Sequence, residues 1–290
     1  MERRTWKLLE ILDQTSGFFS SKGLENSRLQ AEILLAAVLE MGRLDLYLHF
    51  ERILTDSEVG RYRRFVKRRL EGAPVQYITG TAAFRHLELQ VDDAVLIPRP
   101  ETEVLVDVAL QQLASCASPK VVDMGCGSGA VGIALAFECP SAQVLAIDIS
   151  PPALRVTRVN ADQNQVEDRL RLVGSDLFAC LHQSTFASFD LIVSNPPYVA
   201  SPEMPALPVE VREFEPRLAL DGGEEGLDFY RRLALEAPPF LAPHASLVLE
   251  VGHDQSRPVM EILGASGLLE NISSFDDLTE TPRVICAERA

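Results

Sequence analysis

A glycine-rich segment in the middle of the sequence reads Asp123-Met124-Gly125-Cys126-Gly127-Ser128-Gly129. It follows the apolar pair Val121-Val122 and precedes the apolar run 130–137, which predicts a strand, a tight turn and a helix in that order. Glycines allow the backbone to turn sharply and to approach a ligand without a Cβ in the way. The free N–H groups at the start of such a helix attract a phosphate or a carboxylate. We therefore expect this segment to form a loop that binds a cofactor.

Alternating strands and helices extend from this loop to the end of the chain. The expected strands are 121–122, 144–147, 170–173, 191–193, 247–251 and 284–287. The expected helices are 130–137, one that Ser150 caps, 227–236 and 259–263. Alternation of this kind predicts an α/β fold with an open, mostly parallel sheet covered by helices on both faces. In such sheets ligands lie beyond the carboxyl ends of the strands, so side chains that follow a strand are candidate site residues.

The N-terminal part of the chain has a different pattern. Residues 1–73 show helical periodicity without a strand pattern. Ser27 and Gln30 form a capping-box pattern at the start of one expected helix, and Thr55 can cap another. We expect a small helical domain here and the α/β domain over residues 101–290.

The residues between these two domains, 74–100, are expected to form a β-hairpin linker. Apolar and polar residues alternate from Leu87 to Val91, and the apolar run 95–97 follows. These two stretches are typical of a hairpin or ribbon.

Charge and cysteine usage restrict the class of partner. The chain has 290 residues, with 42 Asp and Glu against 27 Lys and Arg, and a formal net charge of −15. Such a surface repels phosphate backbones, so we expect no direct nucleic-acid partner and favour a basic protein partner. The five cysteines are scattered without the paired spacing of a metal site, and we expect reduced thiols and no metal.

Targeting and membrane signals are also missing from the sequence. No apolar run is long enough to span a bilayer. Residues 1–13 lack the apolar core of a signal peptide, and their acidic side chains argue against a transit peptide. We therefore expect a cytoplasmic protein with no membrane partner.

Two cofactors that contain a nucleoside compete for the glycine-rich loop. Asp148 closes the expected strand about 20 residues beyond the loop, where an acid can accept hydrogen bonds from both ribose hydroxyls. Gly125, Gly127 and Ala130 satisfy the dinucleotide fingerprint G-x-G-x-x-[G/A], a weak signal when taken alone. Asp123 would repel a pyrophosphate, whereas it would suit a cationic amino acid.

The spacing Asp-x-Gly-x-Gly-x-Gly resembles the first motif of class-I S-adenosylmethionine methyltransferases. In that family the carboxylate before the first glycine lies near the ammonium group of the methionine moiety, and an acid after the third strand meets the adenine. The resemblance implies S-adenosylmethionine as the cofactor. It also implies cofactor contacts at Asp123, Gly125, Cys126, Gly127, Ser128, Gly129, Asp148, Ile149, Asp176, Leu177 and Asn195.

A second motif, Asn195-Pro196-Pro197-Tyr198, directly follows the expected strand 191–193. An amide or exocyclic amine is a poor nucleophile because its lone pair is delocalised. The Asn195 side-chain oxygen and the Pro196 carbonyl can accept both N–H groups and turn the nitrogen lone pair toward a sulfonium methyl. The prolines stiffen the turn, and Tyr198 can pack flat on a planar amide or base. We predict that these four residues are catalytic and contact the substrate.

The whole chain is similar to the HemK/PrmC family of protein-(glutamine-N5) methyltransferases. The resemblance lies in Leu96-Ile97-Pro98-Arg99-Pro100-Glu101-Thr102-Glu103, in Tyr77-Ile78-x-Gly80, in Phe214-Glu215-Pro216 and in Leu249-Glu250-Val251-Gly252. It implies a Rossmann-like seven-stranded methyltransferase domain and methyl transfer to the glutamine of the Gly-Gly-Gln loop of class-one peptide-chain release factors. It further implies that the N-terminal helical domain helps to hold the release factor, and that Phe84, Arg99 and Glu101 contact the substrate.

One departure from the family pattern lies in the hairpin. The family usually carries Phe-x-Gly there, whereas this chain has Phe84-Arg85-His86. A basic run over residues 61–69 and an acidic segment over 203–228 are candidate docking surfaces, with a solvated helix face as the ordinary explanation for the first.

Two other functions remain open at this stage. A nucleic-acid amino-methyltransferase shares the Asn-Pro-Pro-Tyr motif but predicts a basic recognition segment, which is found only at 61–69. A NAD-dependent oxidoreductase shares the sheet and the glycines but has no use for Asp123 or for the motif at 195–198.

Overall fold

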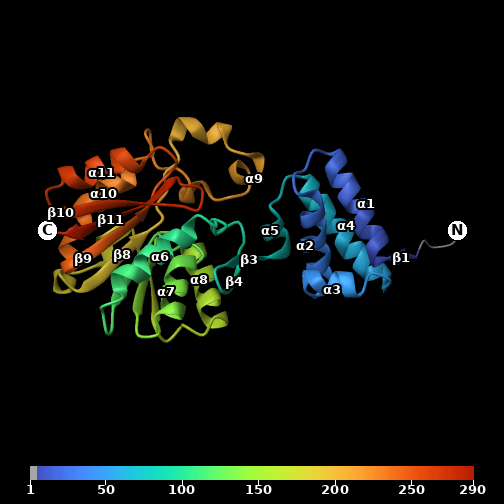
Figure 1. The fold of residues 1–290 in the computed structure, drawn as a ribbon, viewed down its shortest axis with the longest axis horizontal. Coiled ribbons are helices and arrows are strands. Elements are labelled where there is room, and N and C mark those ends of the chain that lie inside the picture. The colour runs from blue at the N-terminus through green and yellow to red at the C-terminus, as the bar shows by residue number, and fades with distance from the viewer. Residues whose placement is uncertain (1–4) are drawn as a thin grey trace. The chain divides into compact units, whose positions relative to one another are not determined.

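A computed structural model describes residues 5–290 of the chain (Figure 1). The part of the signal-peptide prediction that rests on residues 1–4 lies outside the described residues. The chain forms two compact units. The helical unit contains the described residues up to Gly80 together with Val209–Phe214, and the sheet unit contains Thr81–Pro208 and Glu215–Ala290.

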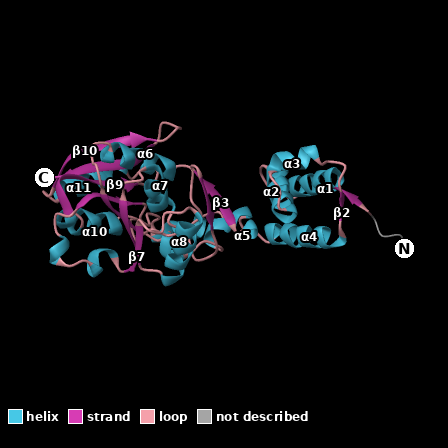
Figure 2. Cartoon of the chain, turned by 90° about the horizontal axis from the view of Figure 1, so that it is seen from below, coloured by secondary structure: helices cyan, strands magenta, loops and turns pink. Residues whose placement is uncertain are grey.

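The helical unit is built from short helices around an apolar core (Figure 2). Its elements are β1 (Trp6–Lys7), α1 (Leu8–Ser21), α2 (Ser27–Leu39), α3 (Arg43–Leu48), β2 (Ile53–Leu54), α4 (Asp56–Leu70), α5 (Val75–Thr79) and α9 (Val209–Arg212). Phe19, Leu34 and Tyr62 are fully buried at its centre. The antiparallel pair of β1 with β2 was not expected, because two residues are too few for a strand pattern.

The two expected helix caps of this unit have different outcomes. At α4 the prediction is confirmed, because Thr55 Oγ1 accepts the Glu58 N–H at 3.2 Å and the Glu58 carboxylate accepts the Thr55 N–H at 2.8 Å. At α2 it is wrong. Asn26 enters the helix in the left-handed conformation, and the Ser27 hydroxyl donates to a carbonyl instead of accepting the N–H of residue 30.

The segment that follows the Asn-Pro-Pro-Tyr motif joins the helical unit at α9. Arg69 of α4, the last residue of the basic run, is only 7% exposed. Its guanidinium binds the Glu210 carboxylate at 2.9 Å, the Gln30 side-chain oxygen at 2.6 Å and the Ala73 carbonyl at 3.1 Å. Arg69 therefore holds α9 against α4, and it is not part of a solvated face.

The sheet unit contains the expected seven-stranded, mostly parallel sheet. The strand order is β10-β11-β9-β8-β5-β6-β7. The five strands β9, β8, β5, β6 and β7 are parallel, whereas β11 pairs antiparallel with both β9 and β10. The strands are β5 (Lys120–Met124), β6 (Gln143–Asp148), β7 (Leu170–Gly174), β8 (Phe189–Ser194), β9 (Leu241–Glu250), β10 (Leu269–Asp276) and β11 (Pro282–Arg289). β10 was not expected, because only its first residue, Leu269, is buried and it lacks an apolar alternation.

Helices cover both faces of this sheet. They are α6 (Thr102–Leu113), α7 (Ala130–Glu138), α8 (Pro151–Gln163), α10 (Asp228–Glu236) and α11 (Ser256–Ala265). Short 3₁₀ helices are η1 (Leu177–Cys180), η2 (Gln183–Thr185), η3 (Ser201–Ala206), η4 (Arg217–Ala219) and η5 (Pro238–Phe240). The Ser150 cap is confirmed, because its Oγ accepts the Ala153 N–H at 3.3 Å.

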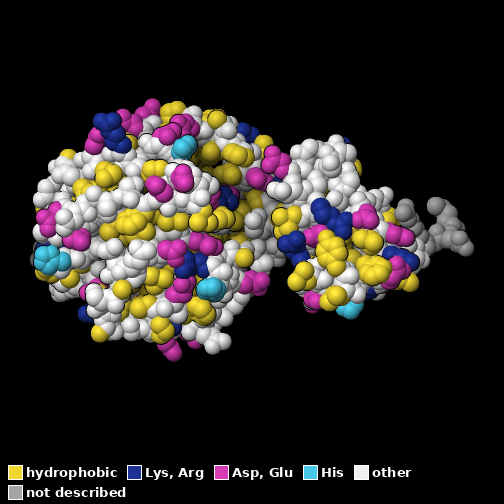
Figure 3. All heavy atoms as spheres, in the orientation of Figure 1, with side chains coloured by type: hydrophobic (Ala, Val, Ile, Leu, Met, Phe, Trp, Pro, Cys, Tyr) yellow, Lys and Arg dark blue, Asp and Glu magenta, His cyan; other side chains and the backbone are white. Residues whose placement is uncertain are grey.

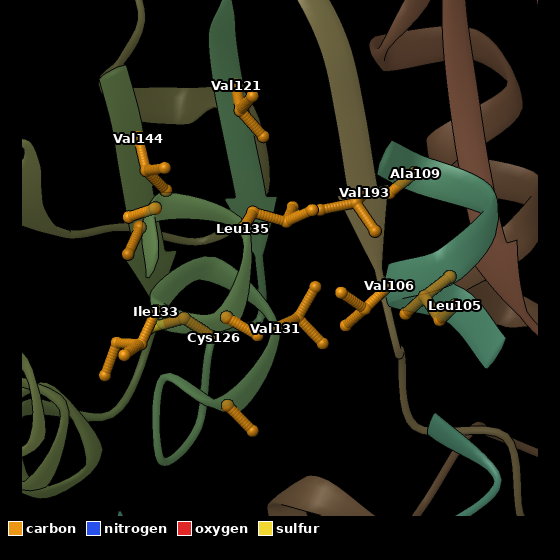
Figure 4. Packing of buried hydrophobic residues seen from close by; sticks show 14 of the residues in the cluster. Leu105, Val106, Ala109, Val121, Cys126, Val131, Ile133, Leu135, Val144 and Val193 are labelled. Carbon is orange, nitrogen blue, oxygen red and sulfur yellow. The ribbon is translucent and has the colours of Figure 1, made fainter. Parts of the chain in front are cut away.

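Successive strand residues supply the two apolar layers. Val121 points to the face covered by α6 and α7, where it belongs to the same apolar cluster as Val106 and Leu135 (Figure 4). Val122 belongs to the opposite layer, in which Tyr230 of α10 is fully buried. The period of two along β5 therefore explains why a continuous apolar run sits between two layers of helices.

The linker contains the expected hairpin, but with different arms. β3 (Thr81–Phe84) pairs antiparallel with β4 (Leu87–Gln90), while residues 95–97 form a loop. Arg85 is the first of the two turn residues between β3 and β4, and its φ is +52°. Its guanidinium binds Glu138 at 2.8 Å and Asp107 at 2.7 Å, and this pairing lowers the pKa of Glu138. Arg85, at the variable position of the family pattern, thus attaches the hairpin to α6 and α7, whereas the residue that departs from the pattern is His86.

Among the helices of residues 5–290, none combines the length and the apolar composition that crossing a membrane requires.

Candidate active site

A cavity of about 370 Å³ lies at the carboxyl ends of the central strands in the sheet unit. Its volume is within the range of sites for small molecules and cofactors. The predicted site residues that line it are Arg99, Asp123, Gly125, Cys126, Gly127, Ser128, Asp148, Ile149, Asp176, Leu177, Asn195 and Pro197. The structure therefore brings most of the predicted cofactor residues together with part of the predicted substrate motif.

The glycine-rich loop begins at the end of β5 and leads into α7. Gly125, Gly127 and Gly129 all have positive φ angles, of 73°, 55° and 83°. A Cβ at Gly125 or Gly127 would meet no atom within 4 Å, so both face open space beside the cavity. A Cβ at Gly129 would lie 2.6 Å from Thr157 Cγ2, so this glycine is required by packing. Gly129 does not line the cavity.

Two buried polar residues of α8 support this loop from behind. The Thr157 hydroxyl donates to the Gly127 carbonyl at 2.8 Å, and the Asn160 amide donates to the Ser128 carbonyl at 2.8 Å. Both side chains are fully buried. We did not predict them, although two polar residues three apart on an otherwise apolar helix face are a usable signal.

Asp123, the fourth residue of β5, is a buried acid. It is 2% exposed, and burial raises its pKa to about 7. Its Oδ2 accepts the Gly132 N–H at 2.8 Å, and none of its interactions with the described residues involves Lys or Arg. A buried carboxylate of this kind favours a positively charged ligand group over a pyrophosphate.

Asp148 is the last residue of β6, and Asp176 follows β7. Asp148 accepts the Gly127 N–H through Oδ2 and the Ser150 N–H through Oδ1, both at 2.8 Å, and burial raises its pKa. These bonds hold it beside the loop while each oxygen retains a lone pair. Asp176 pairs with Arg232 of α10 at 2.8 Å. Arg232 also lines the cavity and was not predicted.

Asn195 follows β8 and lines the cavity. Its Nδ2 donates to the Thr102 hydroxyl at 3.2 Å, which leaves Oδ1 available as an acceptor. Pro197 lines the cavity, whereas Pro196 is buried outside the lining. Tyr198 is half-buried against the apolar layer of α10 and α11 and does not line the cavity, and burial raises its pKa to about 12.

The three remaining predicted substrate residues have separate environments. Arg99 lines the cavity and is ion-paired with Glu215, whose side chain is 1% exposed. Glu101 is exposed at the start of α6, outside the cavity lining. Phe84 is 1% exposed and packs in the apolar core of the sheet unit. The structure thus brings Arg99 to the cavity but not Glu101 or Phe84.

Among residues 5–290, no group of three or more His, Cys, Asp or Glu side chains could hold a metal ion. The groups at the cavity instead fit S-adenosylmethionine: a buried acid for the ammonium, an acid for the ribose and open space over two glycines.

Comparison with known proteins agrees with this geometry. The model of the PrmC N-terminal domain matches residues 10–80, and the model of the methyltransferase small domain matches residues 101–208.

Solved structures share the fold. The catalytic domain of hMettl16 in complex with MAT2A 3′UTR hairpin 6 superimposes with a TM-score of 0.57 at 16% identity, over 82% of this chain and 84% of that one. A methyltransferase from Pyrococcus furiosus gives a TM-score of 0.51 at 17% identity, over 71% of this chain and 90% of that one. These similarities confirm the expected methyltransferase fold.

Curated relatives are far more similar in sequence. The release factor glutamine methyltransferase of Chlorobaculum tepidum is 43% identical over 271 residues, covering 91% of this chain and 92% of the relative. Those of Geobacter sulfurreducens and Rhodopirellula baltica are 41% and 37% identical, with more than nine-tenths of each chain covered. The resemblance to the HemK/PrmC family is confirmed, and the chain belongs to the family of release factor glutamine methyltransferases.

Proposed function

We propose that this protein transfers a methyl group from S-adenosylmethionine to the side-chain amide nitrogen of the glutamine in the Gly-Gly-Gln motif of class-one peptide-chain release factors. The observation that carries the proposal is the position of Asn195. Asn195 lines the cavity with Oδ1 available as an acceptor, in a chain 43% identical to the release factor glutamine methyltransferase of Chlorobaculum tepidum.

The residues at the cavity have distinct roles toward the cofactor in this proposal. Asp123 holds the ammonium of the methionine moiety, and Asp148 accepts the ribose hydroxyls. Asp176 and Leu177 contact the adenine. When bound, S-adenosylmethionine supplies an electrophilic methyl group on a sulfonium centre.

The Asn-Pro-Pro-Tyr motif acts on the substrate amide. Asn195 Oδ1 and the Pro196 carbonyl accept the two N–H groups of the glutamine, so that the nitrogen lone pair faces the methyl group. Tyr198 packs against the planar amide, and the proline-stiffened turn keeps the acceptors in place. Orientation of this kind contributes on the order of 7–11 kcal/mol to catalysis, so no strong general base is required.

The helical domain expected over residues 1–73 helps to hold the release factor, and the hairpin in 74–100 links it to the methyltransferase domain. Exposed apolar side chains on α3 support this role: Leu44 is 81% exposed, Leu48 74% and Tyr47 49%. Such side chains on a small unit are typical of a protein-binding surface. Arg99 and Glu101 contact the substrate, and the protein acts in the cytoplasm.

The experiment is mass spectrometry of a purified release factor after incubation with this protein and labelled S-adenosylmethionine. We expect one methyl group on the Gly-Gly-Gln glutamine. Asn195→Ala should reduce its formation by at least ~100-fold, because the amide is no longer oriented. Binding of S-adenosylhomocysteine should stay close to the wild-type value.

Asn164→Ala is the matched control, since this asparagine lies at the end of α8 outside the cavity lining. Label on RNA or DNA but not on the release factor would move the substrate to nucleic acid. That alternative has weak support, because a fold shared with hMettl16 at 16% identity says nothing of substrate. Asp and Glu side chains are also spread over the visible face of the sheet unit (Figure 3).

A further inference from the structure

A buried carboxyl group lies beside the Asn-Pro-Pro-Tyr motif in the sheet unit. Glu250 is the last residue of β9 and is 1% exposed. Its Oε2 atom has no hydrogen-bond partner among the described residues. Buried carboxyl oxygens are costly to leave unpaired, so an unpartnered one next to a site calls for a functional explanation.

The groups that face Glu250 come from four elements. Glu250 lies beside Asn195, because Ser194 pairs with Leu249 in the parallel register of β8 and β9. The side chains of Thr102 of α6 and Asn195 lower its pKa, and Arg283 of β11 lowers it further. Burial is the largest effect and, with Glu101, raises the pKa to about 7. Tyr230 of α10 donates its hydroxyl to the Glu250 backbone carbonyl at 3.0 Å and not to the carboxyl group. Tyr198, which also follows β8, faces Glu250 as well, and the Glu250 charge contributes to its raised pKa.

An acceptor at the position of the Glu250 carboxylate would fix the direction of the hydrogen bonds that Asn195 makes. An asparagine amide can be turned two ways, and only one presents Oδ1 to a substrate. In the observed orientation Nδ2 donates to the Thr102 hydroxyl at 3.2 Å. A hydroxyl that accepts from Asn195 has its own proton to donate, and an ionised carboxylate can only accept.

We propose that Glu250 is a positioning residue for methyl transfer, whose carboxylate, through Thr102 and directly, holds the Asn195 amide with Oδ1 toward the substrate. This inference rests on the proposed function, because it takes Asn195 as the group that receives the glutamine amide. Glu250 itself does not line the cavity, and it acts only through Asn195.

Glu250→Gln tests the proposal, because it keeps the shape of the side chain and supplies a donor where an acceptor is needed. We expect kcat for release-factor methylation to fall ~10- to 100-fold, as for other small misplacements of catalytic groups. KM for S-adenosylmethionine should change less than about twofold, since the change acts on orientation and not on uniform binding. Glu270→Gln, at an exposed position of β10, is the matched control.

The pH profile separates positioning from a merely structural effect. Wild-type kcat at saturating cofactor should rise with pH through about 7 as Glu250 ionises, and Glu250→Gln should lack this rise. Saturating cofactor is needed because Asp123, which faces the cofactor cavity, also has its pKa raised to about 7.

Variants at Thr102 keep the proposal testable if Glu250→Gln fails to fold. Thr102→Ser retains the hydroxyl, and its kcat should stay near the wild-type value. Thr102→Val lacks the hydroxyl, and its kcat should fall as far as that of Glu250→Gln. Wild-type kcat with an unchanged pH profile in Glu250→Gln, or equal kcat in the two Thr102 variants, would overturn the proposal. A wild-type protein that does not methylate the release factor would instead overturn the proposed function.

Discussion

Single buried side chains at the carboxyl ends of the strands determine the chemistry available at the cavity. Asp123 and Glu250 are both nearly fully buried, and burial raises the pKa of each to about 7. Asp148 has a raised pKa for the same reason, but two backbone N–H groups stabilise its charge. Three acids that look alike in the sequence therefore differ in how strongly they need a positive or hydrogen-bonding partner.

The raised pKa of Asp123 predicts a pH-dependent stability of the ligand-free protein. Its folded-state pKa of about 7 lies above the unfolded value of 3.8, so the folded state binds the proton more tightly between these two values. Its contribution is fully present below pH 3.8 and is lost as the pH rises through 7. Asp123→Asn removes this loss, and should stabilise the ligand-free protein at pH 8 by ~4 kcal/mol relative to wild type.

Thermal unfolding at pH 4 and pH 8 without cofactor measures this difference. The same variant should bind S-adenosylhomocysteine at least ~10-fold more weakly, because an amide does not neutralise an ammonium. Equal stabilisation at both pH values would contradict the assignment of the effect to Asp123 ionisation.

Elements rather than single residues position the glycine-rich loop. It is held between β5, from which it starts, and α8, whose Thr157 and Asn160 side chains donate to the Gly127 and Ser128 carbonyls at 2.8 Å each. At Gly129 the loop leaves no room for a Cβ, which would lie 2.6 Å from Thr157 Cγ2 of α8. Loop geometry thus depends on the packing of α8 as much as on the glycines.

Gly129→Ala should destabilise the protein by ~2 kcal/mol or more, because its Cβ would lie 2.6 Å from Thr157 Cγ2 at a φ of +83°. Gly267→Ala is the control, since it has a φ of +65° but no atom within 4 Å of an added Cβ. Chemical denaturation of both variants measures the difference. A similar loss in both would mean that backbone strain alone accounts for the effect.

At the scale of the whole molecule, the division into two units does not follow the order of the chain. Val209–Phe214 belong to the helical unit although the residues on either side belong to the sheet unit. Much of the acidic segment 203–228 is engaged within the chain, since Glu210 pairs with Arg69, Glu215 with Arg99 and Asp221 with Arg217. These three acids form ion pairs that hold the segment in place within the chain, so they are not free to form an open docking surface.

Arg69→Met should release α9 from α4 and destabilise the protein by ~2 kcal/mol, because Gln30 and the Ala73 carbonyl lose a buried donor. Limited proteolysis should then cut within 209–214 more rapidly, and denaturation should report the loss. Lys67→Met is the control, since its pair with Glu71 is largely exposed and contributes within ~0.5 kcal/mol. Unchanged proteolysis in Arg69→Met would show that α9 is held by other contacts.

Local chemistry was sufficient to predict the sheet, the glycine-rich turn between β5 and α7, and the position of Asn195 after β8. Short apolar runs, glycines and strand-terminal polar residues act through neighbours in the chain, and parallel strands bring their carboxyl ends to one edge. The Thr55 cap was predicted for the same reason, since its partner lies three residues away.

Contacts between distant segments required the tertiary structure. β10 lacks an apolar alternation because most of its side chains are exposed, and the partner of β4 proved to be 81–84. The burial of Phe84, the support of the loop by Asn160 and the acceptor at Glu250 each join residues far apart in sequence. Burial and hydrogen-bond direction depend on both members of such a pair, so they cannot be predicted from the sequence pattern of one segment alone.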